Sequence, residues 1–443
     1  MPFSKFITGL TLISFIAAAA PPTNKLDLSR FVVMGDSLSA GVQNFSLLDT
    51  QQPHGYASVL ATQLGTSLTL PSVPFPGTPN VLELESLTPF PMVAPAPGTL
   101  PFLRDNPDQQ ATNISVPGIT VDQSLHLVPS LAPSAGPVAS WAYIVLSLPG
   151  LPDHPAATQL EEAQVLKPTT VLEWVGNNDA LVPALVGDLS MLTPVVQFAN
   201  DYEAILDALS RTGARIITAT IPDITEVAFF TSMQQLSKKA GVPVSVLTKE
   251  LGTQSGDYLR LSAIPIVDQI LNGQTAGPLP ASCPTPLQEL TPNPIPCVLK
   301  AADAAKLRST IACYNSLIRL ESELHGAITV DANALVNQIY SEGYKVNNQL
   351  LTTSYLGGLF SLDGVHPTNT GYAIIANKFI DVINQRFGTK YQHADVAAIF
   401  AEDPLAKYVP TTKGPLPPVP AEPGPIQGCS SVVPPSVLSA SRQ

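Results

Sequence analysis

The feature of this sequence that most constrains the fold is a set of short apolar runs that alternate with amphipathic, helix-like segments. The apolar runs are RFVVM (30–34), TVLEWV (170–175), ARIITATI (214–221) and AITVDA (327–332). Runs of this length predict buried strands, and strands that alternate with helices predict a mostly parallel sheet with helices on both faces. The predicted fold class is therefore α/β, and ligands are expected at the carboxyl ends of the strands.

Two segments have the spacing of a helix with one buried face. In FANDYEAILDALS (198–210) apolar residues recur at the spacing of one helix face, and Gly213 follows as a natural end. The residues of this face, predicted to be buried, are Phe198, Tyr202, Ile205, Leu206 and Leu209. In TNTGYAIIANKFIDVINQRFG (368–388) Thr368 or Asn369 is expected to cap the start, and Gly388 to end the helix. The residues predicted to be buried in this second helix are Tyr372, Ile375, Phe379, Val382 and Ile383.

The chain begins with the features of a secretory signal peptide. Residues 1–20, MPFSKFITGLTLISFIAAAA, contain one lysine, then an apolar stretch, then small residues. The apolar stretch is too short and too rich in alanine to predict a membrane span. We therefore expect an exported protein, secreted or periplasmic, with cleavage near Ala20 and no membrane span.

Proline clusters divide the rest of the chain. The 45 prolines gather in blocks that interrupt the strand and helix patterns. We interpret residues 21–408 as one large domain with long insertions at about 71–107, 129–165 and 231–300, and residues 409–443 as a Pro-rich tail. Long insertions in an α/β enzyme usually shape the binding cleft. The tail has the composition of an extended segment, and tethering to a surface or partner is an open alternative role for it.

Charge and cysteine content narrow the partners and the compartment. A net charge of −12 argues against nucleic acid or anionic membranes as partners. Four cysteines in an exported protein predict two disulfides, and Cys283 with Cys297, which would close a short Pro-rich loop, is the preferred pair. Neither the cysteines nor the scattered histidines have metal-ligand spacing, so no metal or other cofactor is predicted.

The stretch FVVMGDSLSAGV (31–42) places a serine where the first strand ends. If a helix starts there, Ser37 lies at its N-terminus, where unpaired N–H groups stabilise negative charge. An oxyanion that forms when Ser37 attacks a carbonyl group would gain from that position. The alternative is that Ser37 only caps the helix.

The stretch LDGVHPTNTGY (362–372) supplies a possible base. Asp363 precedes His366 by three residues on a loop flanked by Gly364 and Pro367. A serine nucleophile needs a base, and the base needs an acceptor on its other ring nitrogen, so one loop can provide both. The alternative is a structural histidine near a helix start.

Two further stretches offer hydrogen-bond donors at the same edge of the sheet. EWVGNNDALV (173–182) follows a strand with a glycine and two asparagines, and NISVPGITVDQSL (113–125) places Gly118 between a short apolar segment and a helix-like one. An asparagine amide and a glycine N–H are suitable oxyanion donors. Each glycine is equally compatible with a simple turn.

Together, these four stretches resemble the GDSL family of serine esterases and lipases, also called SGNH hydrolases. The motifs GDSLSAG, NISVPG, GNND and DGVHP occur in the family's order and each follows a strand-like segment. The resemblance implies that Ser37 is the nucleophile, His366 the general base and Asp363 its orienting partner. It also implies an oxyanion hole made by the Ser37 N–H, the Gly118 N–H and the side chain of Asn178.

The resemblance has further implications for fold and function. It implies a flavodoxin-like three-layer α/β/α sandwich with five parallel strands, in which Asp36 and Asp179 hold loops in place. It also implies a serine hydrolase that cleaves carboxylic esters through an acyl-enzyme intermediate, without a cofactor. A carbohydrate O-acetylesterase and a non-catalytic binding relative are the alternatives.

The sequence favours a small-molecule or lipid ester as the substrate, and it leaves the oligomeric state open. Within the third insertion, VLTKELG (246–252) and YLRLSAIPIVDQIL (258–271) are apolar. They are interpreted either as the lining of an acyl-chain pocket or as the core helices of a small subdomain.

Overall fold

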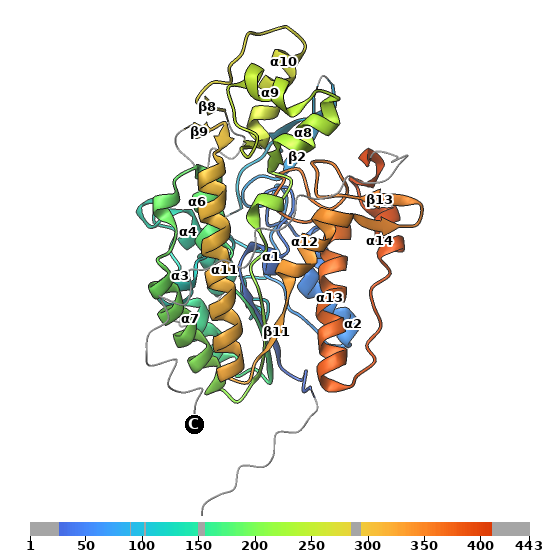
Figure 1. The fold of residues 1–443 in the computed structure, drawn as a ribbon. Coiled ribbons are helices and arrows are strands. Elements are labelled where there is room, and N and C mark those ends of the chain that lie inside the picture. Colours follow the sequence, from blue (N-terminus) through green and yellow to red (C-terminus); the bar gives the residue numbers. More distant parts are fainter. Residues whose placement is uncertain (1–25, 89, 102, 149–155, 285–293, 410–443) are drawn as a thin grey trace, which may run out of the picture.

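The computed structural model describes residues 26–88, 90–101, 103–148, 156–284 and 294–409 (Figure 1). The predicted signal peptide, 1–20, and the tail beyond residue 409 lie outside the described residues. No described helix is both long enough and apolar enough to cross a membrane.

The centre of the fold is a parallel sheet of four strands in the order β1-β4-β5-β11. These strands are β1 (Phe31–Gly35), β4 (Thr170–Trp174), β5 (Arg215–Ala219) and β11 (Ile328–Val330). Each of them falls within or next to one of the four predicted apolar runs, and every pairing between them is parallel. The α/β class predicted from the alternating pattern is confirmed.

The five-stranded sheet implied by the family resemblance is not confirmed. A further extended segment, 112–116, nevertheless lies along the free edge of β1. The Val33 N–H donates to the carbonyl of Thr112 at 2.9 Å, and the N–H groups of Ile114 and Val116 donate to the carbonyls of Val33 and Gly35. Only one residue pair, Val33 with Asn113, meets the geometry of a parallel bridge. This segment therefore extends the sheet without forming a regular strand.

Helices cover both faces of this sheet (Figure 1). Along β1, Val32 and Met34 join one core cluster, whereas Phe31 and Val33 join another, because successive side chains of a strand point to opposite faces. The helices α3 (Val121–His126), α5 (Gln159–Val165), α7 (Val195–Ser210) and α11 (Ala301–Leu324) supply the first cluster. The helices α2 (Tyr56–Leu64) and α13 (Asn369–Phe387) supply the second.

The two helices predicted in detail form close to the expected places. Thr368 is the N-cap of α13, and Gly388 ends the helix in the left-handed conformation, as predicted. The predicted buried face is partly wrong, because Ile375 and Val382 lie at the edge of the cluster and are only partly buried, whereas Ile380 is fully buried. The five apolar residues predicted to be buried in α7 are all buried: Phe198, Tyr202, Ile205, Leu206 and Leu209.

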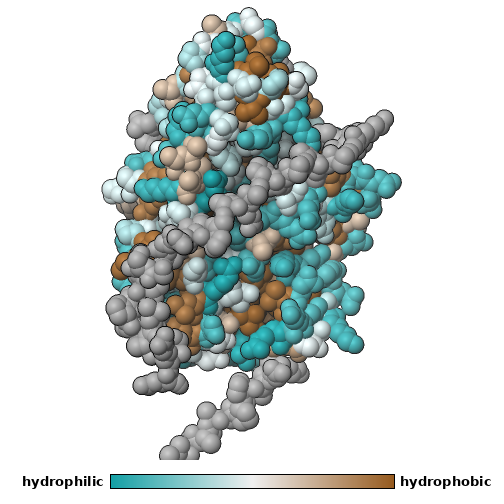
Figure 2. All heavy atoms as spheres, in the orientation of Figure 1, coloured by the Kyte–Doolittle hydropathy of each residue, from teal (hydrophilic) through white to brown (hydrophobic). Residues whose placement is uncertain are grey.

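The third insertion forms a separate lobe beyond the carboxyl edge of the sheet (Figure 1). Its three-stranded sheet pairs β7 (Tyr258–Arg260) with β6 (Phe230–Ser232) and β10 (Val298–Leu299). The helices α8 (Met233–Ala240), α9 (Val244–Leu251) and α10 (Ile264–Leu271) pack with this sheet around a core of their own. On the face drawn in Figure 2, the lobe exposes hydrophobic residues among hydrophilic ones. The subdomain interpretation of 246–252 and 258–271 therefore fits the structure.

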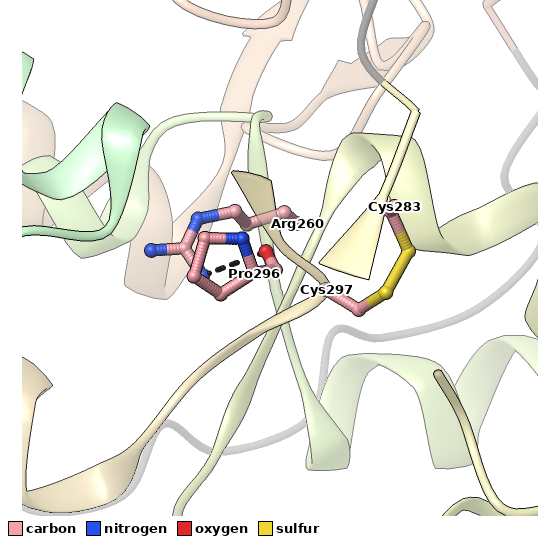
Figure 3. Close-up of a disulfide and its surroundings, with 4 residues drawn as sticks. All are labelled: Arg260, Cys283, Pro296 and Cys297. Carbon is pink, nitrogen blue, oxygen red and sulfur yellow. Dashed lines mark hydrogen bonds between the residues drawn. A yellow bond between two sulfur atoms is a disulfide. The ribbon is translucent and has the colours of Figure 1, made fainter. Parts of the chain in front are cut away.

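A disulfide and a buried arginine hold this lobe together (Figure 3). Cys283 and Cys297 are bonded, as predicted. Cys313 is also disulfide-bonded, and Cys429 lies outside the described residues. The Arg260 guanidinium donates to the carbonyl of Pro296 at 3.0 Å and to that of Ala184 at 2.9 Å. Since Ala184 belongs to α6 (Asn178–Val186), Arg260 joins the lobe to the main domain.

The remaining elements are short. The first insertion contains the hairpin of β2 (Leu82–Ser86) and β3 (Met92–Pro95), and the second contains α4 (Gly136–Leu146). The others are α1 (Ser37–Ala40), α12 (Ala332–Glu342), α14 (Val396–Glu402), β8 (Ser282–Cys283), β9 (Ile295–Pro296), β12 (Tyr344–Val346) and β13 (Gln349–Leu351).

Candidate active site

Ser37 is the first residue of a short helix that follows β1 directly. The N-cap of this helix is Asp36, whose carboxylate accepts the Leu38 N–H at 3.0 Å. The alternative that Ser37 is itself the N-cap is therefore wrong, because that role belongs to Asp36. As the first helical residue, Ser37 has a backbone N–H with no acceptor inside the helix. Among the described residues, neither its hydroxyl nor this N–H has a hydrogen-bond partner.

His366 and Asp363 lie on one buried loop and are hydrogen-bonded to each other. His366 Nδ1 lies 2.9 Å from Asp363 Oδ2. The other carboxylate oxygen, Asp363 Oδ1, accepts the backbone N–H groups of Val365 at 2.7 Å and His366 at 2.8 Å. Burial raises the pKa of Asp363, but the charge of His366 and these hydrogen bonds outweigh burial and hold the pKa below its usual value. Asp363 is therefore an anionic acceptor.

This contact determines which nitrogen of His366 carries the proton. Because the anionic Asp363 accepts from Nδ1, the neutral ring carries its proton there and leaves Nε2 unprotonated. Nε2 is buried and has no hydrogen-bond partner among the residues that the structure describes. A buried nitrogen with a free lone pair is the arrangement that a general base requires.

Gly118 occupies a position that only glycine fits well. Its φ is +76°, and a Cβ atom built there would lie 2.9 Å from Cζ3 of Trp141. The Gly118 N–H has no acceptor within the described part of the chain. It is therefore a free donor on a conformationally restricted turn.

Asn178 begins α6 and donates one amide hydrogen to the carbonyl of Ile119 at 3.0 Å. An asparagine amide has two N–H donors, so one remains for a ligand. The bond to Ile119 also ties the turn that contains Gly118 to the start of α6.

The residues on either side of Asn178 hold loops in place, and Asp179 also lines the cavity described below. Asn177 donates to Asp36 at 2.8 Å, which joins the turn after β4 to the turn after β1. Asp179 accepts the Val121 N–H at 3.0 Å and the Thr193 hydroxyl at 2.6 Å. Burial raises the pKa of Asp36 to about 6 and that of Asp179 to about 7, although these hydrogen bonds oppose the rise.

Four of the predicted residues line one cavity of about 270 Å³, which we call the Ser37 cavity. These residues are Ser37, Gly118, Asn178 and His366, while Asp363 lies behind His366. The site therefore brings together a hydroxyl, a base with a fixed tautomer, and amide donors.

Apolar residues form most of the remaining wall of the Ser37 cavity. Pro79 comes from the first insertion and Trp141 from the second, whereas Leu181 and Leu185 come from α6. No described residue of the third insertion, 231–300, takes part. The Ser37 cavity therefore gives no support to the acyl-pocket interpretation of 246–252 and 258–271. Several apolar residues of these segments are instead buried in the core of the lobe: Leu247, Leu251, Leu259, Val267 and Ile270.

Sequence reasoning missed the contribution of the turn at 43–46. The Phe45 N–H donates to Asp363 Oδ2 at 2.6 Å, and Asn44 accepts the Leu362 N–H at 3.0 Å. Asn44 and Phe45 both have positive φ, which is rare for a bulky residue such as phenylalanine. Asparagine tolerates this conformation and is a weak signal for the turn, but a backbone N–H leaves no signature in a sequence. This turn orients Asp363 from the far end of the chain.

Comparison with solved structures identifies similar proteins of low sequence identity. No protein-family model and no curated protein match this sequence. One similar structure is LAE5, an alpha/beta hydrolase from the metagenome of Lake Arreo, Spain, with 14% identity and a TM-score of 0.36 over 82% of this chain and 97% of that one. Another is a catalytic mutant of Axe2, an acetylxylan esterase from Geobacillus stearothermophilus, with 13% identity and a TM-score of 0.36 over 82% of this chain and 96% of that one. Likenesses this distant do not assign a function, so the function must be argued from the site itself.

Proposed function

We propose that this protein is a serine hydrolase of the GDSL type that cleaves carboxylic esters. The observation that carries the proposal is the shared wall of the Ser37 cavity, where Ser37, Gly118, Asn178 and His366 meet. The 2.9 Å contact between His366 and Asp363 supports it, because it leaves the free lone pair of His366 on the nitrogen that a serine base uses.

In the proposed reaction, Ser37 Oγ attacks the ester carbonyl carbon while its proton passes to His366 Nε2. The electron pair of the C=O bond moves to oxygen, and the N–H groups of Ser37 and Gly118, with the Asn178 amide, stabilise that oxyanion. When the intermediate collapses, the alcohol leaves with the proton from His366, and the acyl group remains on Ser37. A water molecule then attacks the acyl carbon, gives a proton to His366 and releases the carboxylic acid, after which the proton returns to Ser37 Oγ.

The substrate class is proposed from the walls of the cavity. Apolar residues from two insertions and α6 surround the reacting groups, which suits the acyl part of a lipid or small-molecule ester. Export is part of the proposal, and the signal-like segment and the disulfide support it. The proposal includes the flavodoxin-like fold, and the segment 112–116, which extends the sheet beside β1, supports it.

The proposal is tested with a fluorophosphonate, a reagent that phosphonylates activated serines, and with p-nitrophenyl esters of increasing acyl length. We expect the purified mature protein to be labelled on Ser37, as mapped by mass spectrometry, and to hydrolyse the esters equally well with a chelator present. Ser37→Ala should abolish both labelling and turnover. The matched control is Ser39→Ala, since Ser39 is buried in the same motif but hydrogen-bonds to Tyr56.

Other outcomes separate the alternatives. Preference for acetylated sugars over p-nitrophenyl esters would favour the carbohydrate O-acetylesterase. Folded protein that is neither labelled nor active would refute the proposal and leave the binding relative. Turnover that survives in Ser37→Ala would refute the assignment of the nucleophile.

A further inference from the structure

A second cavity of about 80 Å³, which we call the Trp174 cavity, lies at the carboxyl edge of the central sheet. Trp174 ends β4, and Pro222 and Ala332 follow β5 and β11, so the cavity lies where three strands end. In open α/β sheets this edge is the usual place for a ligand. Nothing in the mechanism proposed above uses this cavity.

The walls of the Trp174 cavity are almost entirely apolar. The helices α12 and α13 contribute side chains such as Leu335, Val336 and Ile374, and Thr353 is the one hydroxyl-bearing residue in the described lining. Cavities of about 150 Å³ bind benzene, so this smaller one suits a short alkyl group. The chemistry of the lining therefore selects an apolar group and excludes a charged or sugar-like one.

Several residues that line the Trp174 cavity are sequence neighbours of the candidate catalytic residues. Val365, the neighbour of His366, lines both cavities. Leu38 and Pro367, which follow Ser37 and His366, line the Trp174 cavity alone. The sequence neighbours of the proposed nucleophile and base therefore form part of the wall of the Trp174 cavity.

The positions of the reacting groups decide which half of an ester each cavity takes. The oxyanion donors Gly118 and Asn178 line only the Ser37 cavity, so the carbonyl and its acyl group belong there. The departing alcohol must receive its proton from His366, whose neighbour Val365 lines both cavities. We propose that the Trp174 cavity binds the apolar alcohol half of the ester substrate, an inference that rests on the proposed function.

Trp174, which lines this cavity, also carries a buried donor. The indole N–H of Trp174 is buried and has no acceptor among the described residues. Buried donors are nearly always paired, so an isolated one points to a group that completes it.

The chain offers a direct binding test, because its two tryptophans lie in different cavities. In Trp141→Phe only Trp174 fluoresces, and in Trp174→Phe only Trp141 does. We expect 1-pentanol to change the emission of Trp174 saturably and that of Trp141 only weakly. The Val336→Phe substitution, made in the Trp141→Phe variant, should abolish this change because it fills the cavity. A saturable response of Trp141 alone, or none at either tryptophan, would overturn the proposal.

A kinetic test compares pentyl acetate with methyl acetate. Each buried methylene group favours binding by roughly fourfold, so filling the cavity should lower the pentyl-to-methyl ratio of kcat/KM by about tenfold or more. Val336→Phe should show this loss. Val246→Phe is the matched control, since Val246 on α9 is 44% exposed and lines neither cavity, and its ratio should stay within twofold of the wild type.

The two tests separate a failure of this inference from a failure of the proposed function. An unchanged ratio in Val336→Phe would overturn the inference while fluorophosphonate labelling of Ser37 still supported the hydrolase. If no ester is hydrolysed and Ser37 is not labelled, the proposed function fails, and the pentanol titration alone then decides whether the cavity binds an alcohol.

Discussion

Replacing Gly118 with alanine imposes two separable costs on the folded protein. The first is conformational, because φ at Gly118 is +76° and an L-residue there loses about 1–2 kcal/mol. The second is steric, because the new Cβ would lie 2.9 Å from Cζ3 of Trp141 and 3.2 Å from Cγ2 of Val138. Overpacking of this kind costs about 1–3 kcal/mol. The free energy of unfolding should therefore fall by about 2–5 kcal/mol.

A second glycine isolates the conformational cost. Gly213 has nearly the same φ, +78°, and no atom lies within 4 Å of its Cβ position. Gly213→Ala should therefore lower the free energy of unfolding by only about 1–2 kcal/mol. Trp141→Phe removes the Cζ3 atom, so Gly118→Ala should lower the free energy of unfolding less in that background than in the wild type. Urea unfolding followed by far-ultraviolet circular dichroism measures all of these variants without relying on tryptophan.

The result that would refute the reasoning is a Gly118→Ala variant no less stable than Gly213→Ala. The same variant tests the oxyanion role, because a turn that shifts to relieve the contact also displaces the Gly118 N–H. Loss of one oxyanion donor typically lowers kcat about 10²–10³-fold. Gly213→Ala, far from the Ser37 cavity, should retain full activity.

Three further predictions concern the base, a buried acid and a helix cap. Asp363→Asn should lower kcat by about 10⁴-fold, because His366 loses the anionic partner that fixes its tautomer and stabilises its developing positive charge. Ester hydrolysis kinetics measure this loss, and a decrease of less than tenfold would contradict the proposed role of Asp363. Burial raises the pKa of Glu173 from 4.5 to about 7, so between these values the folded state keeps a proton that the unfolded chain has released, and stability should fall as pH rises through this window. Because glutamine does not titrate, Glu173→Gln should make the free energy of unfolding less dependent on pH, by up to about 1.4 kcal/mol per pH unit. Unfolding measurements at pH 5 and pH 7 test this, and a pH dependence equal to that of the wild type would argue against the raised pKa. Thr368→Ala should destabilise the protein by about 1–2 kcal/mol, because the N-cap bond to the Gly371 N–H at 3.1 Å is lost, whereas Thr368→Ser should retain most of the stability in thermal unfolding.

Local signals in the sequence predicted much of the framework. The strands appear as short apolar runs because both of their faces are buried, and the cap at Thr368 is recognisable because its hydroxyl bonds within its own helix turn. The contact of Asp363 with His366 is also local, since the two residues are three positions apart on one loop. The prediction that Ile375 and Val382 are buried failed because helical spacing gives a direction but not the width of the buried face, which the packing of α2 and the sheet determines.

Tertiary structure alone decided how the site is supported and enclosed. The Phe45 N–H that orients Asp363 comes from 318 residues away, and backbone donors have no sequence signature. Apolar composition did not distinguish segments that line a cavity from segments that form the core of a lobe, because both are equally hydrophobic and differ only in what they pack against. For the same reason, the Trp174 cavity was not foreseen, since its wall is assembled from elements between residues 38 and 375. The sequence by itself indicated which residues are candidates for the chemistry and which segments form strands, because both signals come from near neighbours along the chain. The tertiary structure decided what surrounds them, because cavities arise where packing between distant elements is incomplete.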